Sequence, residues 1–385
     1  MRRTHTEKLS AFIPCLAAAV AMVLSVEVLA EPPTQARMGE MFRALAVAYK
    51  LSLDQSSYED PVNRQEIRRA LEQLSTNARA LQEHGQGRKS SSALVQRSLA
   101  DDSRMALQRF RAGQYRASRF SLNLLTENCF ACHSKLPVHK RSVLGKAFVQ
   151  DAAIQKLAPE QQAQIAVVTR QFDKALSIYE SIFTATSVKP VHVALRGAFE
   201  DYLKLSIRVY GDYDRPLRTF ETMLQQPDLP PFLVSRLRDW IASLRLLRER
   251  DTEGDDLERA RTLIRNAKVE QSYPGSREGL VDLVTASGIL QQYLASSGPD
   301  PSKVVEAYYL LGVAEAFISR SHWISETEFF LETSIRMDPK APTAYKALAF
   351  LEEYIVLGHT GSSGTHVPPE VRANLDELRN LVGRQ

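Results

Sequence analysis

Residues 129–133 of this chain read Cys129-Phe130-Ala131-Cys132-His133. Two cysteines three positions apart are followed at once by a histidine, and in a helix Cys129 and His133 would share one face. Cysteine is rare, with three in 385 residues. The third, Cys15, lies in an apolar segment near the N-terminus. The cysteine pair therefore stands alone in the rest of the sequence.

This spacing is the attachment signature of a c-type haem. Each thiol would form a thioether with one vinyl group, and the adjacent imidazole would become the proximal iron ligand. A disulfide or redox cysteine pair normally opens a helix after a strand, and no strand is indicated here. A zinc site needs about four ligands, and no second cysteine pair exists. The sequence therefore predicts one covalent haem c on Cys129 and Cys132, with His133 as proximal ligand.

Helical periodicity surrounds this motif on the N-terminal side. Expected helices run over Thr34–Lys50, from Asp60-Pro61 to a stop at His84-Gly85, over Ser92–Arg111, and from near Gln114 through the motif. Helices of about 20 residues with short connections pack as antiparallel neighbours. We therefore expect an all-α fold in which residues 31–140 form one four-helix bundle.

Residues 31–140 resemble the cytochrome c′ and cytochrome b562-like family. The shared features are the four helices, a last helix that carries the haem, and the CFACH motif near the end of that helix. The resemblance covers under a third of the chain. It implies a four-helix-bundle c-type cytochrome domain, whose sixth iron position is either filled by a methionine of the first helix or left open.

Two methionines lie early in the first expected helix. Met38 begins an apolar stripe that continues through Met41, Leu45 and Ala48, at the end of the bundle where the fourth helix finishes. We therefore expect Met38 as the distal iron ligand, with Met41 as the alternate. Methionines on such stripes often only fill the core, so a site without a methionine ligand stays open.

Residues 141–385 are also helical in pattern but lack cysteine. The stretch from Ala307 to Leu348 resembles a tetratricopeptide repeat, through Leu311-Gly312, Leu331, Ser334, Asp338-Pro339 and Ala344. Two further helical segments, Leu257 to Lys268 and Arg277 to Leu294, match no repeat pattern. We expect an irregular tetratricopeptide-like α-solenoid over 141–385, and an unrelated helical bundle remains the alternative.

The N-terminal residues 1–30 have the pattern of a secretory signal peptide. Arg2, Arg3 and Lys8 precede an apolar stretch from Ala11 to Val26, and cleavage is expected near Ala30. An uncleaved membrane anchor is the alternative, although the stretch is short for a span. Export to the periplasm is what the haem family implies, since its haem is attached outside the cytoplasm in bacteria. No other segment predicts a transmembrane span in the mature chain.

The formal net charge is only +4, which argues against nucleic acid as a partner. No nucleophile, phosphate-binding or metalloprotease motif is present, so we expect no enzyme. The first functional hypothesis is a periplasmic electron carrier with His133 and Met38 as iron ligands, whose repeats dock a redox protein partner. The alternative is a gas-binding or sensing protein of the cytochrome c′ type, with five-coordinate iron.

Overall fold

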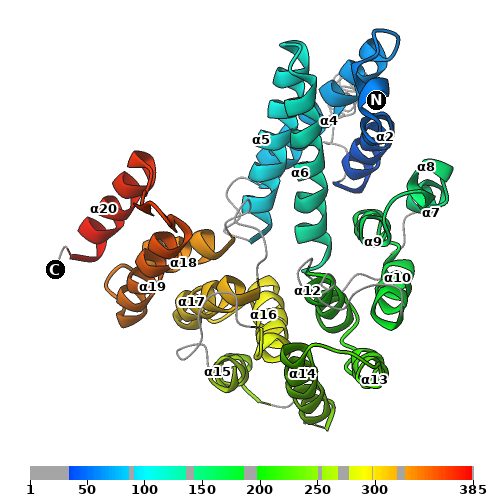
Figure 1. Ribbon diagram of the computed structural model, residues 1–385. Coiled ribbons are helices and arrows are strands. Elements are labelled where there is room, and N and C mark those ends of the chain that lie inside the picture. The colour runs from blue at the N-terminus through cyan, green and yellow to red at the C-terminus, as the bar shows by residue number, and fades with distance from the viewer. Residues whose placement is uncertain are drawn as a thin grey trace, which may run out of the picture.

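The computed structural model is almost entirely helical (Figure 1). It describes residues 34–85, 91–135, 143–185, 197–249, 254–267, 277–296, 298–318 and 326–383. Within these ranges the only strands are β1 (Thr360–Gly361) and β2 (Gly364–Thr365), which form a small antiparallel hairpin. The expectation of an all-α fold is confirmed. The expected signal peptide lies outside the described residues.

Four long helices form the N-terminal part: α2 (Thr34–Ser52), α4 (Arg64–Gly85), α5 (Ser91–Arg111) and α6 (Tyr115–His133). They pack in chain order, α2 on α4, α4 on α5 and α5 on α6. Arg119, near the start of α6, donates from Nε to the Ser52 carbonyl at the end of α2, at 2.9 Å. The two helices therefore run in opposite directions, and the start of α2 lies at the same end as the close of α6.

The connections between these helices follow from their turn residues. Gly113 has a φ of +72° and turns the chain between α5 and α6, a conformation that favours glycine. The segment expected as a plain connection after α2 contains the short helix α3 (Gln55–Glu59), whose N-cap Asp54 accepts from the Ser57 amide. Asp60-Pro61 form a turn before α4 instead of its first residues, because Asp60 accepts from the Val62 amide.

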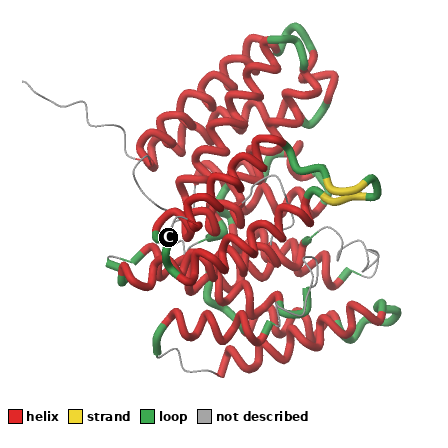
Figure 2. Tube along the Cα trace, turned by 90° about the vertical axis from the view of Figure 1, so that its left-hand side faces the viewer, coloured by secondary structure: helices red, strands yellow, loops and turns green. Residues whose placement is uncertain are grey.

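The remaining described helices pack as successive neighbours. In Figure 1 they form an arc around the lower end of α6, and Figure 2 shows the small hairpin projecting from this array. Their bounds are α7 (Val143–Val149), α8 (Ala152–Gln155), α9 (Pro159–Val168), α10 (Phe172–Thr184), α12 (Ala198–Leu203), the π-helix η1 (Lys204–Val209), α13 (Asp214–Met223), α14 (Pro231–Glu249), α15 (Asp256–Asn266), α16 (Leu280–Ala295), α17 (Pro301–Ile318), α18 (Glu326–Met337), α19 (Pro342–Gly358) and α20 (Pro369–Gly383).

One hydrophobic core runs through both parts of the chain, from Met41 in α2 to Phe330 in α18. A second, smaller cluster joins α18, α19 and α20. Gly312 allows α17 to approach α18 closely, since a Cβ at this position would lie 2.7 Å from Leu331 Cγ. The two parts are therefore in direct contact, and the division after residue 140 stays a prediction.

A fully buried ion pair lies inside the array. Arg208 of η1 donates to Glu315 of α17 at 2.7 Å, and their side chains are 2% and 3% exposed. Ser287 of α16 donates to the same carboxylate at 2.5 Å. Burial alone would raise the pKa of Glu315, but the Arg208 charge, with smaller contributions from Lys204, Ser287 and Lys135, holds this pKa below its ordinary value. The charged pair therefore links three elements of the array.

Replacement of Glu315 by glutamine should lower the free energy of unfolding by about 3–5 kcal/mol, because it leaves the buried Arg208 charge without its partner. Glu352→Gln, which breaks the surface pair with Arg379, is the control and should cost no more than about 1 kcal/mol. Urea unfolding followed by circular dichroism measures both. Equal losses in the two variants would contradict this account.

Candidate functional site

The motif residues lie on the last turn of α6. Phe130 and His133 are buried, Cys129 is half-buried and Cys132 is exposed. Both cysteines are free thiols. The structure therefore places Cys129, Cys132 and His133 at the C-terminal end of one helix.

His133 is held in one orientation by the C-terminal end of α9. Its Nδ1 lies 3.4 Å from the Val167 carbonyl, a long hydrogen bond. Burial and the nearby Arg170 charge lower the pKa of His133 to about 4, so the imidazole is neutral at physiological pH. With Nδ1 donating to Val167, the lone pair is on Nε2. This is the arrangement in which a histidine ligates a metal.

The other ring nitrogen, Nε2, is buried and has no hydrogen-bond partner among the described residues. An unpartnered buried polar atom costs about 1–3 kcal/mol of stability. A bound iron would use this lone pair. The residues present therefore fit a haem whose proximal ligand is His133.

The Cys129 thiol does not have the lowered pKa of a reactive cysteine. Desolvation, with a smaller contribution from Cys132, raises the pKa of Cys129 to about 12. Reactive cysteine pairs instead have a lowered thiol pKa, which supplies the thiolate nucleophile. This electrostatic environment disfavours the disulfide-exchange alternative.

Lys135 follows the motif and is also buried, at 4% exposed. Its ammonium forms an ion pair with Glu326 at the start of α18 and lies 5.9 Å from the centre of the Phe330 ring. The sequence gives no sign of this contact, because its partners lie about 190 residues further along the chain. From the sequence alone, a buried lysine next to the motif cannot be distinguished from a solvent-exposed one.

The two methionines differ in environment. Met41 is 5% exposed and belongs to the main core, whereas Met38 is half-buried and packs at the edge of that core. Both lie on α2, whose start is at the same end as the motif. Their packing does not decide between them, so the identity of the distal ligand stays a prediction.

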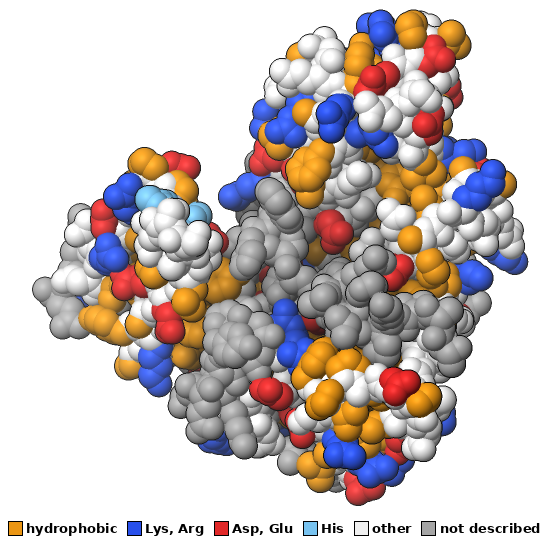
Figure 3. All heavy atoms as spheres, viewed as in Figure 1, with side chains coloured by type: hydrophobic (Ala, Val, Ile, Leu, Met, Phe, Trp, Pro, Cys, Tyr) orange, Lys and Arg blue, Asp and Glu red, His pale blue; other side chains and the backbone are white. Residues whose placement is uncertain are grey.

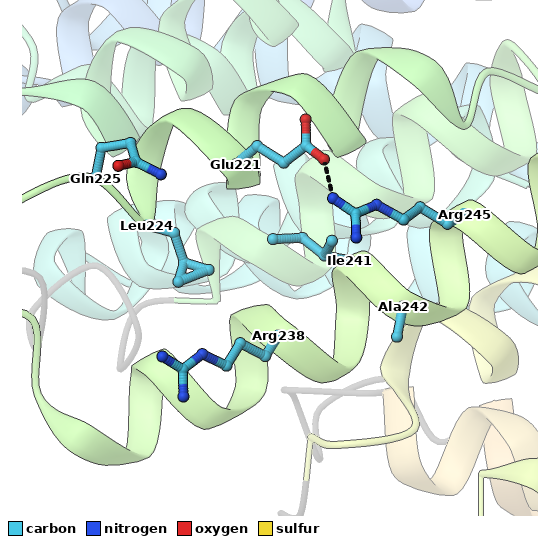
Figure 4. Close-up of a pocket in the computed structure, with 7 residues that line it drawn as sticks. All are labelled: Glu221, Leu224, Gln225, Arg238, Ile241, Ala242 and Arg245. Carbon is cyan, nitrogen blue, oxygen red and sulfur yellow. Dashed lines mark hydrogen bonds and ion pairs between the residues drawn. The ribbon is translucent and has the colours of Figure 1, made fainter.

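A surface pocket of about 570 Å³ lies elsewhere, between α13 and α14 (Figure 4). It is lined by Glu221, Leu224, Gln225, Arg238, Ile241, Ala242 and Arg245, and Glu221 pairs with Arg245 at 2.6 Å. None of the motif residues contributes to it. On the face shown in Figure 3, basic and acidic side chains of the described residues are interspersed, without a continuous basic patch.

Comparisons with known proteins give no match: no family model, no curated protein and no solved structure is significantly similar to this chain. Among the described residues, no three or more His, Cys, Asp or Glu side chains form a cluster that could hold a metal ion on their own. No helix in these ranges is long and apolar enough to cross a membrane. The functional assignment therefore depends on the motif and its geometry.

In the haem-free chain, the buried His133 should make stability depend on pH. Its folded pKa, about 4, is below the ordinary value of 6.5, so the unfolded chain takes up the proton first. The fold should therefore lose about 2 kcal/mol as the pH falls from about 7 to about 4.5. Urea unfolding of protein made without haem maturation measures this, and His133→Phe should remove that part of the loss. An identical pH dependence in the variant would contradict the assigned burial.

Proposed function

We propose that this chain is an exported c-type cytochrome that transfers electrons through one covalently bound haem and docks a redox protein partner with its helical repeats. The observation that carries the proposal is His133 itself. Within a CxxCH motif, its Nδ1 is committed to a carbonyl and its buried Nε2 has no partner among the described residues. A saturated haem iron supplies one-electron transfer.

In this function each residue of the motif has its own role. Cys129 and Cys132 would hold the group through thioethers at one helix end, so that it could not dissociate. His133 would ligate the iron through Nε2, while the Val167 carbonyl fixes the ring. Phe130 and His133 are both buried, which would keep water away from the proximal side.

The fold supports the finer parts of the proposal without identifying a family. The packing of α2, α4, α5 and α6 suits a cytochrome c′-like four-helix bundle, and the antiparallel order of α2 and α6 suits a distal ligand from Met38. The paired helices after residue 140 suit a tetratricopeptide-like solenoid that binds protein. Export to the periplasm, with cleavage near Ala30, completes the proposal.

The second candidate is a gas-binding protein with an open sixth position. It is favoured by the environment of Met41, which would have to leave the core to reach iron. If Met38 also stays out of the site, small ligands would bind the iron directly. Carbon monoxide binding separates the two candidates, because a saturated iron does not take it up.

Haem should remain on the denatured polypeptide. Protein produced in cells with c-type maturation is run on a denaturing gel and stained for haem. The full chain and the Cys15→Ala control should stain, whereas Cys129→Ala with Cys132→Ala should not. An unstained full chain would remove the basis of the proposed function.

Met38→Ala should open the distal position. The ferrous variant should become high-spin and bind carbon monoxide, whereas the unaltered protein should not, because the thioether occupies the sixth position. Optical spectra with and without carbon monoxide measure this. Met41→Ala is the matched control and should mainly cost stability, by about 2–5 kcal/mol. Carbon monoxide uptake by the unaltered protein would favour the gas-binding candidate.

A further inference from the structure

The last residue of the motif, His133, and the second residue after it, Lys135, are contacted by the array from two sides. The C-terminal end of α9 contacts His133, and the start of α18 contacts Lys135. These two contact regions are separated by more than 150 residues of sequence. The array therefore encloses the segment that would carry the iron.

On the first side, the end of α9 is itself fixed in place. The Val167 carbonyl accepts from His133 Nδ1 and also from the Arg170 amide at 2.9 Å. Arg170 closes the helix with a left-handed φ of 57°. Gly145 of α7 lies so close that a Cβ there would be 2.4 Å from the Thr169 carbonyl. The acceptor of His133 thus has little freedom to move.

On the second side, a charged pair holds the chain just after the motif. The side chains of Lys135 and Glu326 are 5% and 14% exposed. Burial of an ammonium is costly unless the charge is paired, so the pair with Glu326 ties this segment to the start of α18. Phe330, one turn along α18, is fully buried under the same ammonium and α18 also packs on α5.

We propose that Glu326, acting through Lys135, and the Val167 carbonyl are positioning groups for the proximal histidine, so that the repeat array forms one side of the haem site and is more than a docking module. This inference rests on the proposed function. Its consequence is that the geometry at the iron depends on a residue of α18.

The test uses the full-length, haem-loaded chain with Glu326→Gln, Lys135→Met and the two changes combined. Each single change breaks the Lys135–Glu326 pair, so the segment from His133 to Lys135 should shift. The paramagnetic resonance signal of the ferric protein should then broaden or split in both singles. In the double variant neither charge remains, methionine still packs on Phe330, and a single signal should return.

The midpoint potential of the haem is an independent measurement, and the two single variants should shift it in opposite directions. Loss of the Glu326 charge should raise the potential, because a more positive surrounding favours ferrous iron, and loss of the Lys135 charge should lower it. The double variant should lie near the unaltered protein. These opposite shifts report the two charges near the iron, whereas the resonance signal reports the position of the histidine. A merely structural pair would change the melting temperature and leave the resonance signal unchanged.

Glu200→Gln is the matched control, since it breaks another buried ion pair of the array, with Arg277 at 2.8 Å. It should cost stability but leave the resonance signal and the midpoint potential unchanged.

If Glu326→Gln does not accumulate, Glu326→Asp replaces it and should change the resonance signal in the same way but by a smaller amount. Unchanged signal and potential in all Glu326 and Lys135 variants would overturn the inference. Loss of haem stain in the unaltered chain would instead overturn the proposed function.

Discussion

A neutral imidazole buried at the end of α6 is the constraint on which the arrangement of the two parts depends. His133 is 6% exposed, and only one of its two nitrogens has a hydrogen-bond partner among the described residues. A fold optimised only for stability would place an apolar side chain there, because the unpartnered nitrogen costs about 1–3 kcal/mol. The end of α9 supplies a backbone acceptor for the imidazole, so this helix must close over the end of α6 at that position. A local cost in stability of this kind is characteristic of ligand-binding sites.

Buried charges define how the remaining helices fit together. Lys135 with Glu326, Arg208 with Glu315 and Arg277 with Glu200 each join segments distant in the sequence. A buried charge is tolerated only where its partner lies next to it. A helix displaced along its neighbour would therefore leave buried charges uncompensated. The apolar faces of such an array are less selective, since many alanine and leucine contacts can be exchanged at small cost. The pairs therefore favour one arrangement of helices over its alternatives.

The helices of the N-terminal part could be predicted closely because their signals are local. An expected helix over Thr34–Lys50 corresponds to Thr34–Ser52, and one over Ser92–Arg111 to Ser91–Arg111. The motif could likewise be read from spacing alone. The acceptor of His133 could not, because it is a backbone carbonyl 34 residues away, and any residue type offers a carbonyl. Glu326 was missed for a related reason, since acidic residues are common on helices and only tertiary packing distinguishes the buried one.

The order of these elements along the chain bears on how such a site is assembled. The end of α9 contacts His133 and the start of α18 contacts Lys135, so the end of the motif is covered once both helices are in place. On the proposed function, the haem would be attached before that cover is complete. The motif precedes both enclosing helices in the sequence, with α9 starting at Pro159 and α18 at Glu326. A group attached first would then be part of the core against which the later helices pack. Because a ligand that binds only the folded state stabilises it, attachment and closure of the array would favour each other.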